Sequence, residues 1–187
     1  AINEALHQAM ELDDSVFVIG EDVAGCSGSA GDVGAVGGVF GVTEGIYHRW
    51  PDRCIDTPIS ESAIVGAAAG AALVGMRPVA EIMFADFIGV CMDQIVNQMA
   101  KFRYMFGGKS RCPAVIRFSS GGGFSAAGQH SQAMYQVMTS FPGLKVVVPS
   151  NAYDAKGLML SAIQDDDPVL FFEPKILYQE TAEVPDE

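Results

Sequence analysis

Short, mostly apolar runs recur along this chain, and segments with helical periodicity separate them. The runs occupy residues 16–19, 54–57, 79–84, 114–118, 144–148 and 169–172. A strand that is apolar at almost every position is typical of a sheet covered on both faces. Strands that alternate with helices form parallel sheets. The sequence therefore predicts an α/β domain with a mostly parallel sheet and helices on both faces.

The segments between these runs carry the periodicity of helices. Residues 1–12 place their apolar side chains on one stripe, and residues 87–104 do so over a longer span. Further helices are expected at 43–50, 62–75, 133–139 and 152–164. The one at 62–75 consists mostly of alanine and glycine. Glycine costs about 1 kcal/mol in a helix interior, so we expect close packing against a neighbour there.

The charge of the chain excludes two classes of partner. Lys and Arg number 11 and Asp and Glu number 23, so the formal net charge is −12. This balance argues against a broad basic surface for nucleic acid or for an anionic membrane. The longest uncharged apolar run, 62–76, is shorter than the roughly 20 residues of a membrane span. With 49% hydrophobic residues, we expect a large core, a subunit interface, or both.

Several familiar motifs are absent or incomplete. The four cysteines are far apart and form no C-x-x-C, which favours a reducing compartment. Residues 107–110 resemble the end of a phosphate-binding loop, but Arg103 stands where its first glycine is required. The glycine-rich stretch 25–41 contains no G-x-G-x-x-G, and no G-x-S-x-G occurs anywhere. Nucleotide binding by these motifs and serine hydrolysis are therefore not expected.

Polar residues follow several of the predicted strands. Glu21 follows the first strand, Glu61 the second and Asp86 the third, and the segment that contains His130 follows the fourth. Ligands of parallel α/β sheets bind beyond the carboxyl ends of the strands, so we expect any site among these residues. Taken alone, Glu61 suits a helix N-terminus and His130 suits an ordinary loop.

A series of segments in one order resembles the β subunit of thiamine-diphosphate-dependent 2-oxo acid dehydrogenases, a family that includes acetoin dehydrogenases. These segments are 56–62, 80–87, 93–95, 100–104, 129–132, 142–149, 154–158 and 173–178. The resemblance covers nearly the whole chain. It implies a transketolase-type pyrimidine-binding domain over residues 1–179, with 180–187 beginning a linker to a C-terminal domain that this chain lacks. The pyrimidine-binding domain of this family is a parallel α/β sheet, in agreement with the alternation of strands and helices above.

The resemblance also implies roles for individual residues. Glu61 matches the carboxylate that hydrogen-bonds the aminopyrimidine ring of the cofactor and favours its imino tautomer. Phe87 matches an aromatic ring that lies against the aminopyrimidine, although a phenylalanine here also suits an ordinary core. His130 matches the histidine that acts near the cofactor when an acyl unit passes to a lipoyl group, with general acid/base and orienting roles.

Metal sites follow from the same resemblance. A structural potassium ion is implied at Ala114, Ala162, Ile163, Asp165 and Asp167, mostly through backbone oxygens, although Asp167 departs from the expected Asn. The family anchors Mg²⁺ and the diphosphate with Gly-Asp-Gly and a later Asn, and Gly31-Asp32-Val33 is not that motif. We therefore expect the α subunit to hold both groups, and this chain alone to bind no cofactor and to be inactive.

The resemblance implies partners and a cellular location. An α2β2 heterotetramer with an α subunit is expected, together with a lipoyl-bearing acyltransferase component. The location is the bacterial cytoplasm, or the mitochondrial matrix or plastid of a eukaryote.

The substrate stays open between acetoin and pyruvate. Residues 103–109 and 150–154 resemble acetoin dehydrogenases, whereas 171–178 resemble pyruvate or branched-chain enzymes. Three alternatives remain: a branched-chain 2-oxo acid dehydrogenase β subunit, a catalytically silent binding or scaffolding domain, and a fragment like transketolase or 1-deoxyxylulose-5-phosphate synthase.

Overall fold

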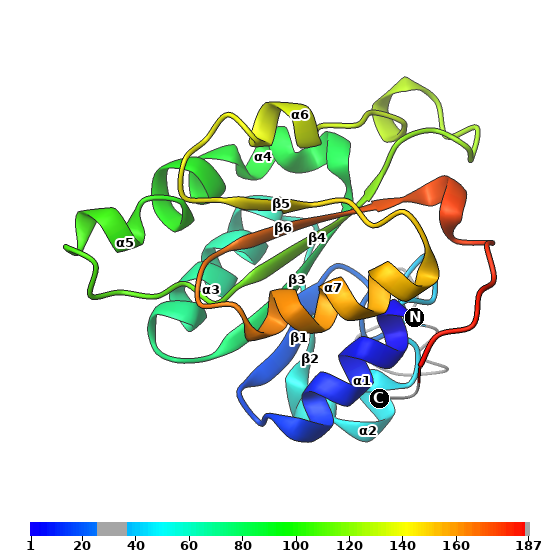
Figure 1. Cartoon of the computed structure of the whole chain (residues 1–187), viewed down its shortest axis with the longest axis horizontal. Coiled ribbons are helices and arrows are strands. Elements are labelled where there is room, and N and C mark those ends of the chain that lie inside the picture. The colour runs from blue at the N-terminus through cyan, green and yellow to red at the C-terminus, as the bar shows by residue number, and fades with distance from the viewer. Residues whose placement is uncertain (26–36, 186–187) are drawn as a thin grey trace.

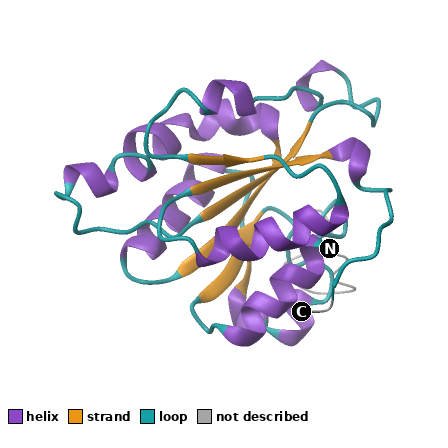
Figure 2. Ribbon diagram, in the orientation of Figure 1, coloured by secondary structure: helices purple, strands orange, loops and turns teal. Residues whose placement is uncertain are grey.

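Six strands form one sheet in which every pairing is parallel. The computed structural model describes residues 1–25 and 37–185, so Gly31-Asp32-Val33 and Cys26 lie outside the described residues. The strands are β1 Val16–Gly20, β2 Cys54–Asp56, β3 Arg77–Phe84, β4 Val115–Ser120, β5 Lys145–Val147 and β6 Val169–Pro174. Their order is β2-β1-β3-β4-β6-β5, and Figure 2 shows the strands side by side in one sheet. The predicted parallel α/β fold is confirmed.

Helices cover both faces of this sheet (Figure 1). One face carries α1 Ile2–Leu12, α2 Ile46–Arg49 and α7 Ala152–Gln164. The other carries α3 Glu61–Leu73, α4 Ile88–Asp93 and α6 Tyr135–Met138, and α5 Phe102–Met105 projects beyond the sheet. Short turns of other helix types lie at Pro51–Arg53, Ala85–Phe87, Gln94–Met99, Gly128–His130 and Lys175–Leu177. No helix in the described part of the chain has the length and apolar character to cross a membrane.

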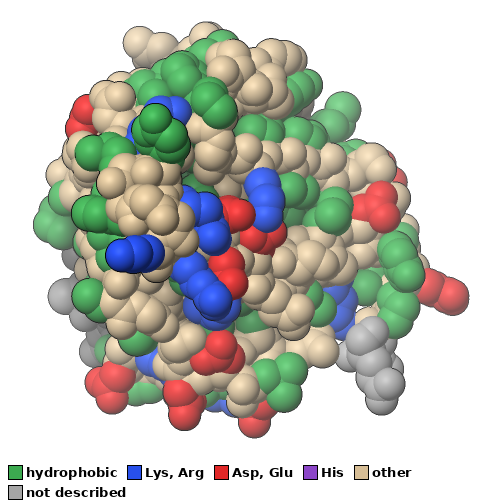
Figure 3. Space-filling model, turned by 60° about the vertical axis from the view of Figure 1, so that its left-hand side comes forward, with side chains coloured by type: hydrophobic (Ala, Val, Ile, Leu, Met, Phe, Trp, Pro, Cys, Tyr) green, Lys and Arg blue, Asp and Glu red, His purple; other side chains and the backbone are tan. Residues whose placement is uncertain are grey.

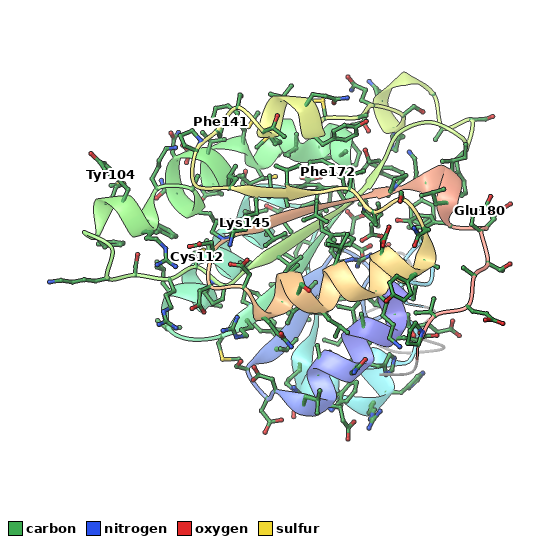
Figure 4. All side chains as sticks on the ribbon, in the orientation of Figure 1. Tyr104, Cys112, Phe141, Lys145, Phe172 and Glu180 are labelled. Atoms are coloured by element: carbon green, nitrogen blue, oxygen red, sulfur yellow. The ribbon has the colours of Figure 1, made fainter. Side chains whose placement is uncertain are left out.

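Successive strand residues face opposite cores, because side chains alternate along a strand. In β1, Phe17 and Ile19 pack against the α3 side, while Val16 and Val18 pack against the α1 side. Phe172 of β6 lies between the layers in Figure 4. This two-sided burial is the physical reason for the mostly apolar runs of the sequence.

The cysteines of the described chain are core residues. Cys54, Cys91 and Cys112 are buried free thiols. Burial raises the pKa of each thiol to about 12. They therefore act as small apolar side chains in these layers.

The continuous helix predicted over 87–104 is wrong. The structure divides it into α4, a π-helical segment at Gln94–Met99 and the short α5. The Ala100 N–H donates to the Ile95 carbonyl, five residues earlier, at 3.0 Å. One extra residue per turn interrupts the α-helix there. The apolar positions still face the core on both sides of the interruption, so periodicity alone did not reveal it.

Gly143 and Gly157 offer a matched test of backbone geometry. Gly143 has φ +98, and a Cβ added there would lie 2.0 Å from the carbonyl oxygen of Ala100, whereas Gly157 in α7 has open space around it. Gly143→Ala should lower the free energy of unfolding by more than about 2 kcal/mol through strain and overlap. Gly157→Ala should raise it by up to about 1 kcal/mol. Urea unfolding of the two variants checks both signs, and similar effects at the two positions would contradict this account.

Candidate functional site

The chain reverses its direction across the sheet between β1 and β3. From β1 it continues to β2 on one side, and from β3 to β4 on the other. In such sheets the crevice at this switch point, beyond the carboxyl ends of the strands, is the usual ligand site. Glu21 follows β1 here, and Asp86 and Phe87 follow β3. The switch point therefore lies among polar residues that the sequence indicated.

Aromatic rings surround His130 at this edge. The imidazole packs edge-to-face on Phe84 with ring centroids 4.5 Å apart, and on Phe87 with centroids 5.3 Å apart. Phe84 ends β3, Phe87 lies three residues later, and His130 ends the Gly128–His130 turn after β4. Two of the predicted site residues are thus brought into direct contact, and Phe87 also packs against the core on the α3 side.

Glu61 is the first residue of α3 and is half-buried. The next residue, Ser62, donates from its hydroxyl to the carbonyl oxygen of Val90 at 2.6 Å. That bond joins the start of α3 to α4, which begins directly after Phe87. Glu61 therefore stands next to the helix that presents the aromatic ring.

Acidic groups gather on the β1 side of the site. Burial, followed by the charges of Asp22, Glu61 and Glu81, raises the pKa of Glu21. One side of the switch point is therefore acidic, while the other, around His130, is aromatic.

Three buried polar atoms at this edge have no hydrogen-bond partner in the described part of the chain: Thr57 Oγ1, Asp86 Oδ2 and Ser120 Oγ. Thr57 follows β2, Asp86 follows β3 and Ser120 ends β4. Buried polar groups are normally paired, so these atoms are suited to a polar ligand or ordered water.

A buried ionic network lies directly beneath the site. Arg117 of β4 donates to both carboxylate oxygens of Glu173 on β6, at 2.6 and 2.9 Å, and to Glu81 on β3 at 2.6 Å. The Tyr178 hydroxyl donates to Glu173 at 2.7 Å. Burial opposes the charge on Arg117, but Glu173 and Glu81 outweigh it and raise the pKa of the guanidinium. These ion pairs thereby link the three neighbouring strands β3, β4 and β6.

Comparison with known proteins agrees with this architecture. The sequence matches the family described as "Transketolase, pyrimidine binding domain" over residues 1–181. The chain belongs to this family. The fold of the pyrimidine-binding domain is similar to the structure titled "Split gene transketolase, inactive beta4 tetramer", with a TM-score of 0.68 and 21% identity over 91% of this chain and 48% of that one.

Curated relatives of the pyrimidine-binding domain are dehydrogenase subunits. Acetoin:2,6-dichlorophenolindophenol oxidoreductase subunit beta of Cupriavidus necator is 59% identical over all of this chain and 55% of that protein. The 2-oxoisovalerate dehydrogenase subunit beta of Bacillus subtilis is 48% identical over 96% and 52% of the two chains. Pyruvate dehydrogenase E1 component subunit beta of Rickettsia felis is 44% identical over 100% and 54%. The chain spans about half the length of these relatives.

The residues predicted to hold potassium lie at the opposite edge of the pyrimidine-binding domain. Ala114 precedes β4, and Asp165 and Asp167 precede β6. Arg77 donates to the carbonyl oxygens of Ile163 and Asp165 at 2.9 and 3.0 Å. The Val169 and Asp165 N–H groups donate to the carbonyl oxygens of Ala114 and Ala162. These carbonyl oxygens thus already accept hydrogen bonds from the protein. Potassium binding at these residues stays a prediction.

Basic side chains surround this aspartate loop of the pyrimidine-binding domain. Figure 3 shows Lys and Arg gathered around acidic groups, and ion pairs join Arg103 to Asp167 and Lys145 to Asp165, both at 2.6 Å. Figure 4 shows Lys145 at this end of the domain, below the projecting Tyr104. Residues 1–25 and 37–185 contain no group of three or more His, Cys, Asp or Glu side chains placed to hold a metal ion.

Sequence reasoning missed three parts of the site. Phe84 was assigned only to a strand, although its ring contacts His130. Lys175 donates to the His130 carbonyl oxygen, and Arg117 pairs with carboxylates 36 and 56 residues away. A charged residue inside an otherwise apolar strand, such as Arg117, was the one available signal, because buried charges require partners.

The Arg117 network predicts a large loss of stability when one carboxylate is neutralised. Glu173 is 2% exposed and Arg117 3%, so Glu173→Gln leaves a buried charge poorly compensated. The free energy of unfolding should fall by about 3 kcal/mol. The matched control is Glu11→Gln. Glu11 pairs with Arg49, and both side chains are about half exposed. For this variant the free energy of unfolding should fall by less than about 1 kcal/mol. Equal losses in chemical denaturation would contradict the structural importance of this network.

Proposed function

We propose that this chain is the pyrimidine-binding part of the β subunit of a thiamine-diphosphate-dependent dehydrogenase. The observation that carries the proposal is the position of Glu61, at the first turn of α3 and beside the helix that follows Phe87. A carboxylate and aromatic rings at one switch point suit an aromatic, protonatable heterocycle. The names of the relatives agree with this function.

The residues of this edge fit the aminopyrimidine half of thiamine diphosphate. Glu61 accepts a hydrogen bond from a ring nitrogen and holds the proton there. Phe87 offers an apolar face to the ring. When bound, the cofactor supplies a carbon nucleophile and an electron sink for cleavage next to a carbonyl group. The buried and unpartnered Thr57 Oγ1 supports the presence of a polar ligand here.

We assign the diphosphate and its Mg²⁺ to an α subunit. The formal net charge of −12 and the acidic residues Glu21, Asp22 and Glu61 make this edge unfavourable for a diphosphate. The site of this chain is therefore half of a complete site, and the other half comes from a partner.

The surface of α3 supports association with that partner. The helix is apolar on every side, yet Ala63, Ala67, Gly70 and Leu73 are exposed. Among the described residues, no atom outside the adjoining backbone of α3 lies within 4 Å of the position that a Cβ on Gly70 would take. A helix that is apolar all round is normally buried, so a second subunit is the expected cover. The predicted packing reason for Gly70 thus lies outside this chain.

Acetoin is the substrate that the comparisons favour. Relatives at 59% and 57% identity are acetoin:2,6-dichlorophenolindophenol oxidoreductase subunits, whereas the 2-oxo acid dehydrogenase subunits reach 48% or less. A 2-oxo acid such as pyruvate is the second candidate. In both cases we propose that the acyl product passes to a lipoyl group of an acyltransferase partner, with His130 as general acid/base.

The function is tested with the full-length subunit that carries this chain, assembled with its α subunit. Reduction of 2,6-dichlorophenolindophenol by acetoin, pyruvate and a branched 2-oxo acid identifies the substrate. Glu61→Gln should lower this rate by about 100-fold or more, because proton transfer loses its carboxylate. Glu11→Gln is the control and should retain the rate. A fully active Glu61→Gln enzyme would contradict the proposed role, and an assembled wild type inactive on all three substrates would favour a silent scaffolding domain.

His130→Ala separates acyl transfer from dye reduction. The variant should lose acylation of the lipoyl acceptor by about 100-fold or more and keep most dye reduction, since only the transfer uses the imidazole. Acylation is followed by mass spectrometry of the isolated lipoyl domain. Normal acylation by His130→Ala would remove the histidine from the mechanism.

A further inference from the structure

Lys175 is a buried cation without an anionic partner. Its residue is 1% exposed, and among residues 1–25 and 37–185 no carboxylate oxygen lies within the 4.0 Å of an ion pair. Burial lowers the pKa of its ammonium group, and the charge of Asp86 opposes that shift. Burying an ammonium without an anionic partner is energetically unfavourable. A position of this kind calls for a specific role.

The contacts of Lys175 converge on His130. The ammonium donates a hydrogen bond to the backbone carbonyl oxygen of His130. It also lies over the ring of Phe84, with Nζ 4.8 Å from the centroid, and the imidazole packs against the same ring. Lys175 thus holds the backbone of His130 while Phe84 contacts both side chains.

Asp86 holds the other side of the same loop. Its Oδ1 accepts from the backbone N–H of Gln132 at 3.2 Å and from the side-chain amide of Gln132 at 2.9 Å. Asp86 follows β3 and Lys175 follows β6, and these two strands flank β4, which leads into the loop. The histidine is therefore held between a cation and an anion from the neighbouring strands.

The loop before His130 has an unfavourable backbone. Ser125 has φ +52 and Ala127 has φ +58, although neither is glycine. Such conformations are strained and persist only where surrounding contacts enforce them. Lys175 supplies such a contact at the end of this segment.

Lys175 is itself fixed by the ionic network beneath it. Glu173, two residues earlier, is bound by Arg117 and Tyr178. The end of β6 is therefore held in place, and the lysine extends from it toward His130.

We propose that Lys175 is a positioning residue for His130, which it acts on through the hydrogen bond to the His130 carbonyl and the shared Phe84 ring. The effect of Lys175 on the position of the loop does not depend on what reaction the enzyme catalyses. Its consequence for acyl transfer rests on the proposed function of His130.

The first test is spectroscopic and needs no enzyme activity. Histidine-labelled protein gives one imidazole signal for each histidine, among them His7, His48 and His130, and His130→Ala assigns the signal of His130. Edge-to-face packing on Phe84 and Phe87 shifts the His130 signal by ring currents. Lys175→Met should move that signal toward the shift of an exposed histidine and leave His7 and His48 unchanged. An unchanged His130 signal in folded Lys175→Met would overturn the proposal.

Two further variants keep this test decisive. Lys156 of α7 is also buried and also donates to a backbone carbonyl oxygen, that of Pro185 at 2.6 Å. Lys156→Met is therefore the matched control and should leave the His130 signal in place. Should Lys175→Met fail to fold, Lys175→Gln, which keeps a neutral donor, should move the signal part of the way. No movement in that variant would equally overturn the proposal.

The second test uses the assembled enzyme and acylation of the lipoyl acceptor. Lys175→Met should lower acylation by about 100-fold, the effect of misplacing a catalytic group by about 1 Å. The double variant with His130→Ala should be no slower than His130→Ala alone, because both changes act on one group. Independent, multiplying losses would overturn the positioning role. Full acylation by His130→Ala would instead refute the proposed catalytic role of His130, and the placement of the loop by Lys175 would then be tested by the spectroscopic experiment alone.

Discussion

The centre of this domain depends on the buried ion pairs of Arg117. This arginine stands on β4 opposite Glu81 of β3 in the parallel register, and it binds Glu173 on the other neighbouring strand. A slip of one residue would turn these side chains to the other face and leave buried charges unpaired. The network thus favours one register of the three central strands. Phe84, the His130 loop and Lys175 all follow those strands, so the site inherits its geometry from that register.

Local pattern was sufficient to predict the strands but insufficient to predict the site. Residues 16–19 and 169–172 are apolar at each position because both faces of the sheet are covered, and that property is visible in any short window. The contact of Lys175 with His130 joins residues 45 positions apart. No periodicity reports such a contact. The residue assignments of Glu61, Phe87 and His130 came from resemblance, and the structure adds their surroundings.

The error in the long helix has the same origin. Residues 87–104 keep their apolar spacing although the hydrogen bonding changes at Gln94–Met99. The change lies where Lys101 donates to the Pro142 carbonyl oxygen and where Gly143 closely approaches Ala100. These tertiary contacts favour the interruption, and a pattern that records only burial does not register them.

The half-site and the exposed helix face are one feature of α3. Glu61 occupies the first turn, and the small residues that follow leave one side of the helix without cover in this chain. A partner that packs on Ala67 and Gly70 would approach along the axis that ends at the carboxylate. It would also bring its own groups to the acidic side of the switch point, where Glu21, Asp22 and Glu61 of this chain disfavour a diphosphate. Under the proposed function, assembly and cofactor binding are coupled through a single helix, and a loss of either is expected to weaken the other.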